Sequence, residues 1–223
     1  MKRIRCTLSL LPLLFVVTPF AQAQSSFDVN MGFGSAHAPA SGAGIDNGNS
    51  PTNPFGSCVP NTGDPFCQAT PGLGGFFLGF GGNVMLQKHY GVGMEFSITP
   101  ARQDYASLQY RQLFYDFNGF YAPINEKKVQ LQIQGGIGGA RTSYALTQSG
   151  CVGPACSTVT TPIGNNSHFQ IHVGVGIQIY ITEHVFIRPQ FDYRYIPNFT
   201  NEFGSTSVPQ GMVWIGYSFG DRT

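Results

Sequence analysis

The feature of the sequence that most constrains the fold is a long alternation of side-chain types over residues 168–181. The odd positions carry only Phe, Ile and Val, whereas the even positions carry His, Gln, Gly and one Tyr. Side chains of a β-strand point alternately to its two faces, so one face of this segment is apolar and the other is small or polar. Strands of soluble proteins usually run about five or six residues, whereas a strand that crosses a membrane needs about ten. The length therefore favours a membrane-spanning strand.

The same alternation recurs in seven other segments, so we expect about eight strands. These segments are 27–34, 76–86, 92–99, 105–121, 129–138, 185–195 and 213–219. Within 105–121 the parity slips near Arg111 and Gln112, which predicts a β-bulge at that point. Pro189 falls on the apolar parity of its segment and predicts one broken ladder bond.

The composition indicates whether the apolar face of the sheet points outward to lipid or inward to a protein core. Charged residues make up 10 % of the chain, against about 25 % in ordinary soluble domains. A soluble lipocalin-like barrel or sandwich is the competing fold, but its outer face would then carry mostly Gln, Gly, Ser and Asn. No stretch is apolar enough for a membrane-spanning helix. We therefore predict an all-β transmembrane antiparallel up-and-down β-barrel with its apolar stripes toward lipid.

The N-terminus has the layout of a secretory signal peptide. Lys2, Arg3 and Arg5 precede a short apolar run, and Ala21-Gln22-Ala23 follows it as a cleavage pattern. The run is too short for a transmembrane anchor. We expect residues 1–23 to be removed and residues 24–223 to form the barrel domain. Nine Lys and Arg then face eleven Asp and Glu, a balance that argues against nucleic acid as a partner.

The connections differ in length, as they do in bacterial barrels. Short segments lie around 87–91, 122–128 and 182–184, and long ones rich in Gly, Pro, Ser, Thr and Asn lie around 35–71, 144–167 and 197–209. Short turns on the periplasmic side and longer loops outside are the usual layout.

These segments together resemble the small outer-membrane barrels of the OmpA/OmpX-like type, within the outer-membrane β-barrel domain family. The most specific piece is the last segment, GMVWIGYSFG. There Val213, Ile215, Tyr217 and Phe219 resemble the alternating, aromatic-ended signal that the barrel-assembly machinery reads, although Gly220 and three further residues follow the last aromatic. The resemblance implies a cell outer-membrane location, with lipid and that machinery as partners.

Four cysteines follow the predicted signal peptide, and each pair lies within one long loop. They are Cys58 with Cys67 and Cys151 with Cys156. Export to an oxidising compartment favours disulfides over metal ligands or reactive thiols. We expect two local disulfides, with pairing across the two loops as the alternative.

Charged side chains on the inward parity predict a polar network in the lumen. A turn at 182–184 places Gln178 opposite Arg188, Gly174 opposite Asp192 and His172 opposite Arg194. Buried charges must be paired and hydrogen-bonded, so we expect ion pairs that plug the lumen; the alternative is a gate to a narrow pore. The predicted network comprises Asp28, Glu95, His172, Arg188, Asp192 and Arg194.

The histidines invite comparison with enzymes that modify lipid A. His168 and His172 share one face, and Ser167 adjoins them. Neighbouring residues of a strand point to opposite faces, so Ser167 and His168 do not form a nucleophile and base pair. A metal site lacks further ligands. We predict no catalytic, metal or cofactor site.

The sequence thus predicts a non-enzymatic outer-membrane barrel, monomeric, with a structural or surface-interaction role carried by its long loops and an extracellular partner that is not specified. A narrow channel for small solutes is the first alternative, and a lipid-A-modifying enzyme is the second.

Overall fold

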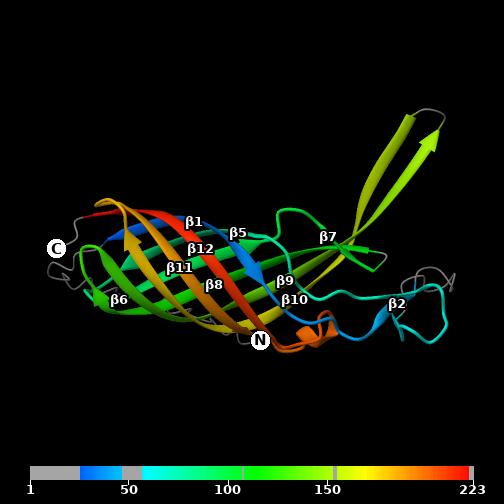
Figure 1. Cartoon of the computed structure of the whole chain (residues 1–223), viewed down its shortest axis with the longest axis horizontal. Helices are drawn as coiled ribbons and strands as arrows, with labels where there is room; N and C mark the ends of the chain where they lie inside the picture. The colour runs from blue at the N-terminus through cyan, green and yellow to red at the C-terminus, as the bar shows by residue number, and fades with distance from the viewer. Residues whose placement is uncertain (1–25, 47–56, 107, 153–154, 221–223) are drawn as a thin grey trace, which may run out of the picture.

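A ring of eight antiparallel strands forms the body of the molecule. The computed structural model describes residues 26–46, 57–106, 108–152 and 155–220, so the predicted signal segment 1–23 lies outside the described residues. Each strand pairs with the next around the ring, and the last pairs with the first, which closes the barrel (Figure 1). The ring consists of β1 (Phe27–Ala36), β5 (Phe77–Met85), β6 (Tyr90–Ile98), β8 (Leu108–Asn125), β9 (Val129–Val152), β10 (Ala155–Tyr180), β11 (Val185–Tyr195) and β12 (Ser207–Phe219).

The predicted alternation sets which side chains face out. Along β1, Phe27, Val29, Met31 and Phe33 are exposed on the outer face, while Asp28 and Asn30 are buried inside. The same division holds on β10, where Ile171, Val173 and Val175 are exposed while Gln170 and His172 are buried. An outer face of bare aliphatic and aromatic side chains is stable only against lipid. Among the described residues, no helix is long and apolar enough to cross a bilayer.

The two ends of the barrel differ. At one end, here called the turn end, residues 86–89, 126–128 and 181–184 make short connections, and β12 ends there (Figure 1). At the other, the loop end, lie the longer connections and, among the described residues, five accessory elements. Three of them, β2 (Gly44–Asp46), β3 (Ser57–Cys58) and β4 (Cys67–Ala69), form a small sheet, and the others are the short strand β7 (Gln103–Tyr105) and the 3-10 helix η1 (Phe199–Asn201).

The predicted bulge at Arg111 and Gln112 is wrong. Even positions point inward without interruption from Leu108 to Ala122, and β8 keeps one register with β9 from Gln109 to Tyr121. The alternation looked broken because Tyr110 and Phe114 point inward although they are aromatic. On the other strands, aromatic side chains lie mostly on the outer face. The register shift on this strand lies instead between Tyr121 and Ile124.

The fourth predicted strand also begins later than expected. Tyr105 belongs to a separate short strand, β7 (Gln103–Tyr105), which folds back on the start of β8. Ala106, in the turn between them, has a φ of 53°. This left-handed conformation lets the chain reverse within the space of a few residues.

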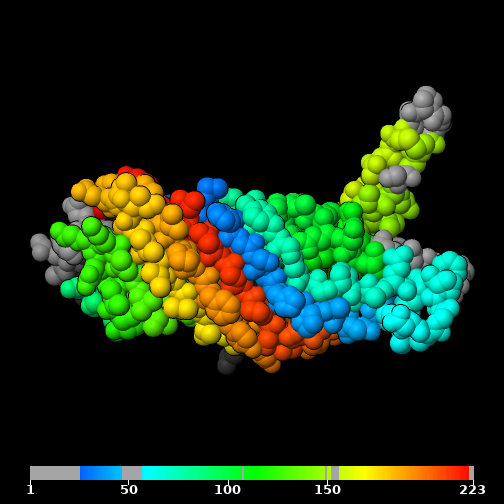
Figure 2. All heavy atoms as spheres, in the orientation of Figure 1, coloured from blue at the N-terminus to red at the C-terminus, as the bar shows by residue number. Residues whose placement is uncertain are grey.

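The segment around 144–167 is a paired ribbon and not an irregular loop. β9 and β10 remain in register past the barrel, out to Val152 and Ala155, with one shift between Pro162 and Gly164. The resulting hairpin leaves the barrel at an angle and stands free of its body (Figures 1 and 2). The sequence predicted a long connection here, and its many Gly, Ser and Thr residues gave no indication that the two halves of the connection would pair.

Candidate functional site in the lumen and at the loop end

The six residues predicted to form the lumen network all lie inside the ring. None is more than 3 % exposed, although they come from four strands: Asp28 from β1, Glu95 from β6, His172 from β10, and Arg188, Asp192 and Arg194 from β11. The predicted register of β10 with β11 is present, with His172 opposite Arg194 and Gly174 opposite Asp192. The pairing has a gap beside Pro189 and resumes at Ile179 and Ile187 without a shift.

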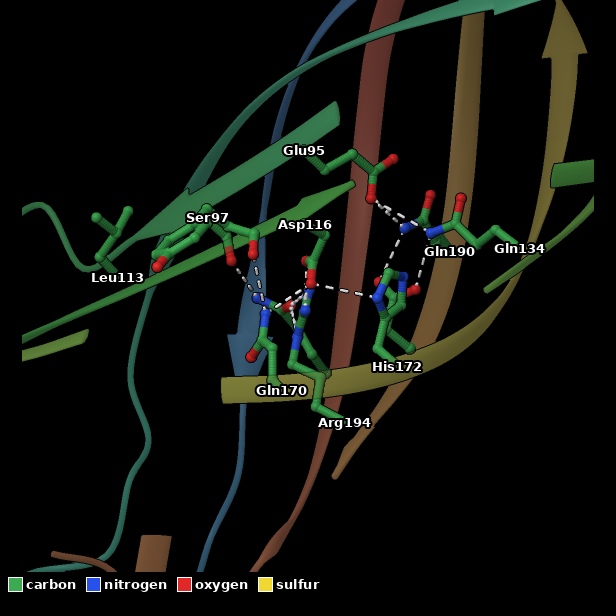
Figure 3. A network of polar contacts seen from close by, with 12 residues as sticks. Glu95, Ser97, Leu113, Asp116, Gln134, Gln170, His172, Gln190 and Arg194 are labelled. Carbon is green, nitrogen blue, oxygen red and sulfur yellow. Dashed lines mark hydrogen bonds and ion pairs between the residues drawn. The ribbon is translucent and has the colours of Figure 1, made fainter. Parts of the chain in front are cut away.

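One cluster is centred on Glu95. Its Oε1 accepts a hydrogen bond from Nη2 of Arg188 at 2.6 Å, and Arg188 also donates to Gln132 at 2.8 Å. Gln134 and Gln190 each donate to Glu95 and to Asp192, which links the two carboxylates through amides (Figure 3). Glu95 therefore has a fully buried cationic partner.

A second cluster is centred on Asp116 (Figure 3). Nη1 of Arg194 donates to one carboxylate oxygen of Asp116, and Nδ1 of His172 lies 3.2 Å from the other. Gln170 donates to Asp116 at 2.6 Å. Arg194 also donates from Nε and Nη2 to Gln210, at 3.0 and 2.7 Å.

Asp116 is the central residue that the sequence reasoning missed. It lies on β8, whose alternation was misread as slipping a few residues earlier. Continuous even parity from residue 108 would have placed Asp116 in the lumen beside Asn118 and Gln112. The signal was present in the sequence, but the inward aromatic residues obscured it.

The glutamines continue the network toward the turn end. Gln132 donates to Gln130 and to Gln178, each at 2.9 Å, and Gln178 donates to Asp28 at 3.2 Å. A neutral amide both donates and accepts, so a row of glutamines joins separate charges without adding another.

An apolar cluster fills the lumen from the polar network to the loop end. Its largest member, Trp214, lies over Gly32 and Gly79; an added Cβ there would approach the indole to 2.6 and 2.5 Å. Small residues on β1 and β5 thus make room for one large side chain. The two regions meet where Arg188 lies over the Trp214 ring and Arg194 lies over the Phe114 ring. The buried members are Ala36, Ala38, Leu73, Phe77, Tyr105, Tyr110, Phe114, Ala140, Ile196, Phe199, Phe203, Val208, Met212 and Trp214.

The connection between β11 and β12 folds over the loop end as a cap. Phe199 and Phe203 point into the apolar cluster, and Glu202 between them is buried. Glu202 is held on three sides: its side chain accepts from Asn166 at 2.7 Å and from His168 at 2.9 Å, and its backbone carbonyl accepts from the Tyr105 hydroxyl. Burial raises the pKa of Tyr105 to about 12.

The two histidines considered for catalysis have different partners. His168 pairs with Glu202 at the cap, whereas His172 lies deeper, beside Asp116. Ser167 is exposed, while His168 is partly buried on the opposite parity. The structure therefore does not bring Ser167 and His168 together as nucleophile and base.

The cysteines are joined in the local arrangement. Cys58 and Cys67 link β3 to β4 within the small sheet, where β2 lies between the two strands. Cys151 and Cys156 face each other across the hairpin near its tip, with their Cα atoms 4.0 Å apart. Neither bond ties the two loops to one another.

The proposed assembly signal lies on the outer face of the closing strand. Ile215, Tyr217 and Phe219 are exposed, and Val213 is partly so. Their neighbours are β1 on one side and β11 on the other, so this strand is the one that closes the ring. Its role in assembly stays a prediction.

Comparison with known proteins assigns this architecture to a family. Residues 7–219 match the family model described as outer membrane protein beta-barrel domain. Neisserial surface protein A has a similar solved structure, with a TM-score of 0.52 and 12 % identity over 88 % of this chain and 99 % of that one. OprG from Pseudomonas aeruginosa has a TM-score of 0.51 and 14 % identity over 90 % of this chain and 98 % of that one. Ail, the attachment invasion locus protein of Yersinia pestis, has a TM-score of 0.50 and 11 % identity over 88 % of this chain and 99 % of that one. A search of curated proteins found no match. At such identities the structural likeness shows the fold alone, but the family match covers most of the chain. The chain belongs to the outer membrane protein beta-barrel domain family and is a protein of the outer membrane.

Proposed function

We propose that this protein is a non-conducting, non-enzymatic barrel whose loop end faces outward and contacts a partner through the β9–β10 hairpin. Short turns face the periplasm and longer structures face outward in bacterial barrels, which supports this orientation. The barrel is then the anchor, and the projecting ribbon is the part that meets other molecules.

The observation that carries the proposal is the nature of that ribbon. β8 pairs with β9 only as far as Gln109 with Ala145, and β11 pairs with β10 only from Ile171. Beyond these points the two strands pair only with each other among the residues that the structure describes. Residues 142–167 include no Asp, Glu, Lys, Arg or His, and Val159 and Ile163 are exposed.

Such a ribbon is unusual for a surface that only faces water. Exposed strand edges invite pairing, and proteins usually protect them with charges or cover them. This hairpin projects two open edges without a single charge, and the Cys151–Cys156 bond holds its strands together near the tip. Rigid, uncharged and partly apolar surface of this kind suits contact with another macromolecule.

The proposal is tested by shortening the ribbon. Residues 147–160 are replaced by Asn-Gly, which favours a tight hairpin turn, and adhesion of expressing bacteria to epithelial cells is counted. We expect at least a tenfold loss, with equal surface expression and an unchanged heat-dependent shift of the barrel in electrophoresis. Adhesion that is equal with and without the ribbon would refute the proposal.

A pair of point variants tests which property of the ribbon matters. Val159→Lys replaces an exposed apolar side chain with a charge, and we expect it to reduce adhesion severalfold. Ser157→Lys is the matched control because it adds the same charge two residues away without removing an apolar side chain. Equal effects of the two variants would show that charge alone, and not the apolar contact, is responsible.

The alternative functions have their own readouts. A narrow channel predicts ion conductance, which the packed lumen argues against. A lipid-A-modifying enzyme predicts a mass change in lipid A from expressing cells. We propose that neither is observed.

A further inference from the structure

A recess lies at the foot of the hairpin, where four segments of the loop end meet. It has a volume of about 220 Å³. The small sheet forms one wall with Gly44 and Ile45, the β7–β8 turn contributes Tyr105, and the hairpin base and the cap complete it. The walls are held in place by covalent and hydrogen bonds, since the small sheet carries its own disulfide and the cap is bonded to both β7 and β10.

At the recess lies a buried carboxylate that is not fully satisfied. Glu202 lines the recess and is 2 % exposed. Nε2 of His168 is 2.9 Å from each carboxylate oxygen, but its single N–H can point at only one, and the well-aligned bond is to Oε1. Asn166 also donates to Oε1. Among the described residues, Oε2 accepts no hydrogen bond. A buried carboxylate oxygen without a donor is costly, so a bound donor there is stabilised.

The rest of the lining is polar but uncharged. Two tyrosine rings, of Tyr105 and Tyr144, meet edge to face with their centroids 5.2 Å apart. Glu202 is the one charged side chain among the described residues that line the recess. Hydroxyls and amides make up the remaining polar lining, which includes Ser41, Ser57, Thr70, Asn166 and Asn201.

We propose that this recess binds one neutral sugar ring. Oε2 of Glu202 is buried, so a sugar hydroxyl can donate to it only when the carboxylate turns slightly toward the recess, and a neighbouring hydroxyl can accept from the amide of Asn166 or Asn201. The partly buried ring of Tyr144, supported from behind by Tyr105, offers apolar surface to the C–H face of a sugar. The recess is smaller than the roughly 300–1,000 Å³ of sites for drug-sized ligands, which suits a single ring.

The charge of the recess decides between classes of ligand. A sulfated or acidic sugar would bring a second negative charge beside the Glu202 carboxylate, which is unfavourable at low dielectric. A primary ammonium group would satisfy Oε2 but cannot accept hydrogen bonds from the two amides, because it only donates. A neutral polyol uses both kinds of partner, so the lining favours it over either ion.

This inference rests on the proposal that the loop end is a recognition surface, and it names a ligand class for that surface. The neutral sugar can come from lipopolysaccharide of the same membrane or from another cell. The shared chemistry is a hydroxyl-rich ring without charge, and competition experiments separate the two sources.

The test uses the full barrel in detergent and saturation-transfer NMR with glucose, galactose, mannose and N-acetylglucosamine. We expect at least one of these to bind with a dissociation constant on the order of 1 mM. Glu202→Gln removes the unpaired carboxylate oxygen and Asn201→Ala removes an exposed amide; each is expected to weaken binding at least threefold. Asn165→Ala is the matched control, because Asn165 is exposed on the adjacent strand and does not line the recess.

Each outcome bears on the proposal. Saturation of a neutral sugar that both recess variants weaken supports it. No saturation by any neutral sugar, or stronger binding of a sulfated sugar or a primary amine, overturns it. Competition by lipopolysaccharide core oligosaccharide identifies the same membrane as the source, and competition only by oligosaccharides of another cell identifies that cell; both support a sugar site.

The two proposals fail separately. The variant with residues 147–160 shortened keeps every described residue that lines the recess, so we expect it to bind sugar while losing adhesion. Hairpin-dependent adhesion without sugar binding would remove only the recess proposal. If the protein binds sugar but adhesion is equal with and without the hairpin, only the hairpin proposal is refuted.

Discussion

The lumen contains two regions that are filled in opposite ways. Around Glu95 and Asp116, charged groups and glutamines satisfy one another through directed hydrogen bonds. From Trp214 to the cap, aromatic and aliphatic side chains pack mainly by shape, and the hydroxyls of Tyr105 and Tyr110 donate hydrogen bonds at its rim. Both regions exclude solvent, but the first depends on matching partners and the second on matching volume. The two regions should therefore respond differently to substitutions of similar size.

The largest effect is expected in the polar region. Arg188→Met removes the cation that pairs with Glu95 but keeps a long side chain. A buried charge without its partner costs about 3–5 kcal/mol, so we expect the free energy of unfolding to fall by that amount. Urea unfolding in lipid vesicles, followed by fluorescence of the single tryptophan, measures it. Adding Glu95→Leu to Arg188→Met should recover most of the loss; a single variant as stable as the wild type would contradict the pairing.

A substitution of similar size in the apolar region should cost less. Met212→Leu keeps the apolar volume beside Trp214, and swaps of this kind usually cost under about 1.5 kcal/mol. The same unfolding experiment compares it directly with Arg188→Met. A larger loss from Met212→Leu than from Arg188→Met would reverse the proposed difference between the regions.

Alkaline pH should loosen the cap before it affects the polar region. The pKa of Tyr105 is raised by burial from 10.0 to about 12, so the folded cap favours its protonated form. This contribution is complete below pH 10 and is lost as the pH rises toward 12. We expect limited proteolysis at the cap to accelerate over this interval, and Tyr105→Phe to reduce the pH dependence without removing it, because Tyr110 is a second buried phenol packed against Phe203 of the cap. An unchanged dependence in Tyr105→Phe would assign it to another group.

The smallest effect on the barrel is expected from the disulfide near the hairpin tip. Cys151→Ser with Cys156→Ser opens a link that closes only a short loop outside the barrel. We expect the unfolding midpoint of the barrel to stay unchanged while proteolysis within the hairpin becomes faster. A clear drop in the midpoint would show that the hairpin and the barrel unfold together.

The strands and the lumen charges could be predicted because each depends on one simple period. Alternation together with a three-residue turn at 182–184 placed His172 opposite Arg194 and Gly174 opposite Asp192. Asp116 was missed because Tyr110 and Phe114 put aromatic side chains on the inward parity, which alternation cannot distinguish from the lipid face. The sequence pattern therefore could not reveal that an apolar cluster fills part of the lumen.

The loop end could not be predicted for a different reason. The ribbon at 144–167 has the composition of a loop, and its strands are held by pairing with each other. The contacts of Glu202 with Asn166, His168 and Tyr105 join parts of the chain that are far apart in sequence. No local pattern marks such contacts, so the cap and the recess emerge only from the folded structure.

The central claim is that the polar and the apolar region together close the lumen. Planar-bilayer recording of the purified barrel tests this most directly. We predict no ion-conducting steps from the wild type over the usual range of voltages, while Trp214→Ala combined with Phe114→Ala, which empties the centre of the apolar cluster, increases leakage. Steady single-channel conductance from the wild type would contradict the account.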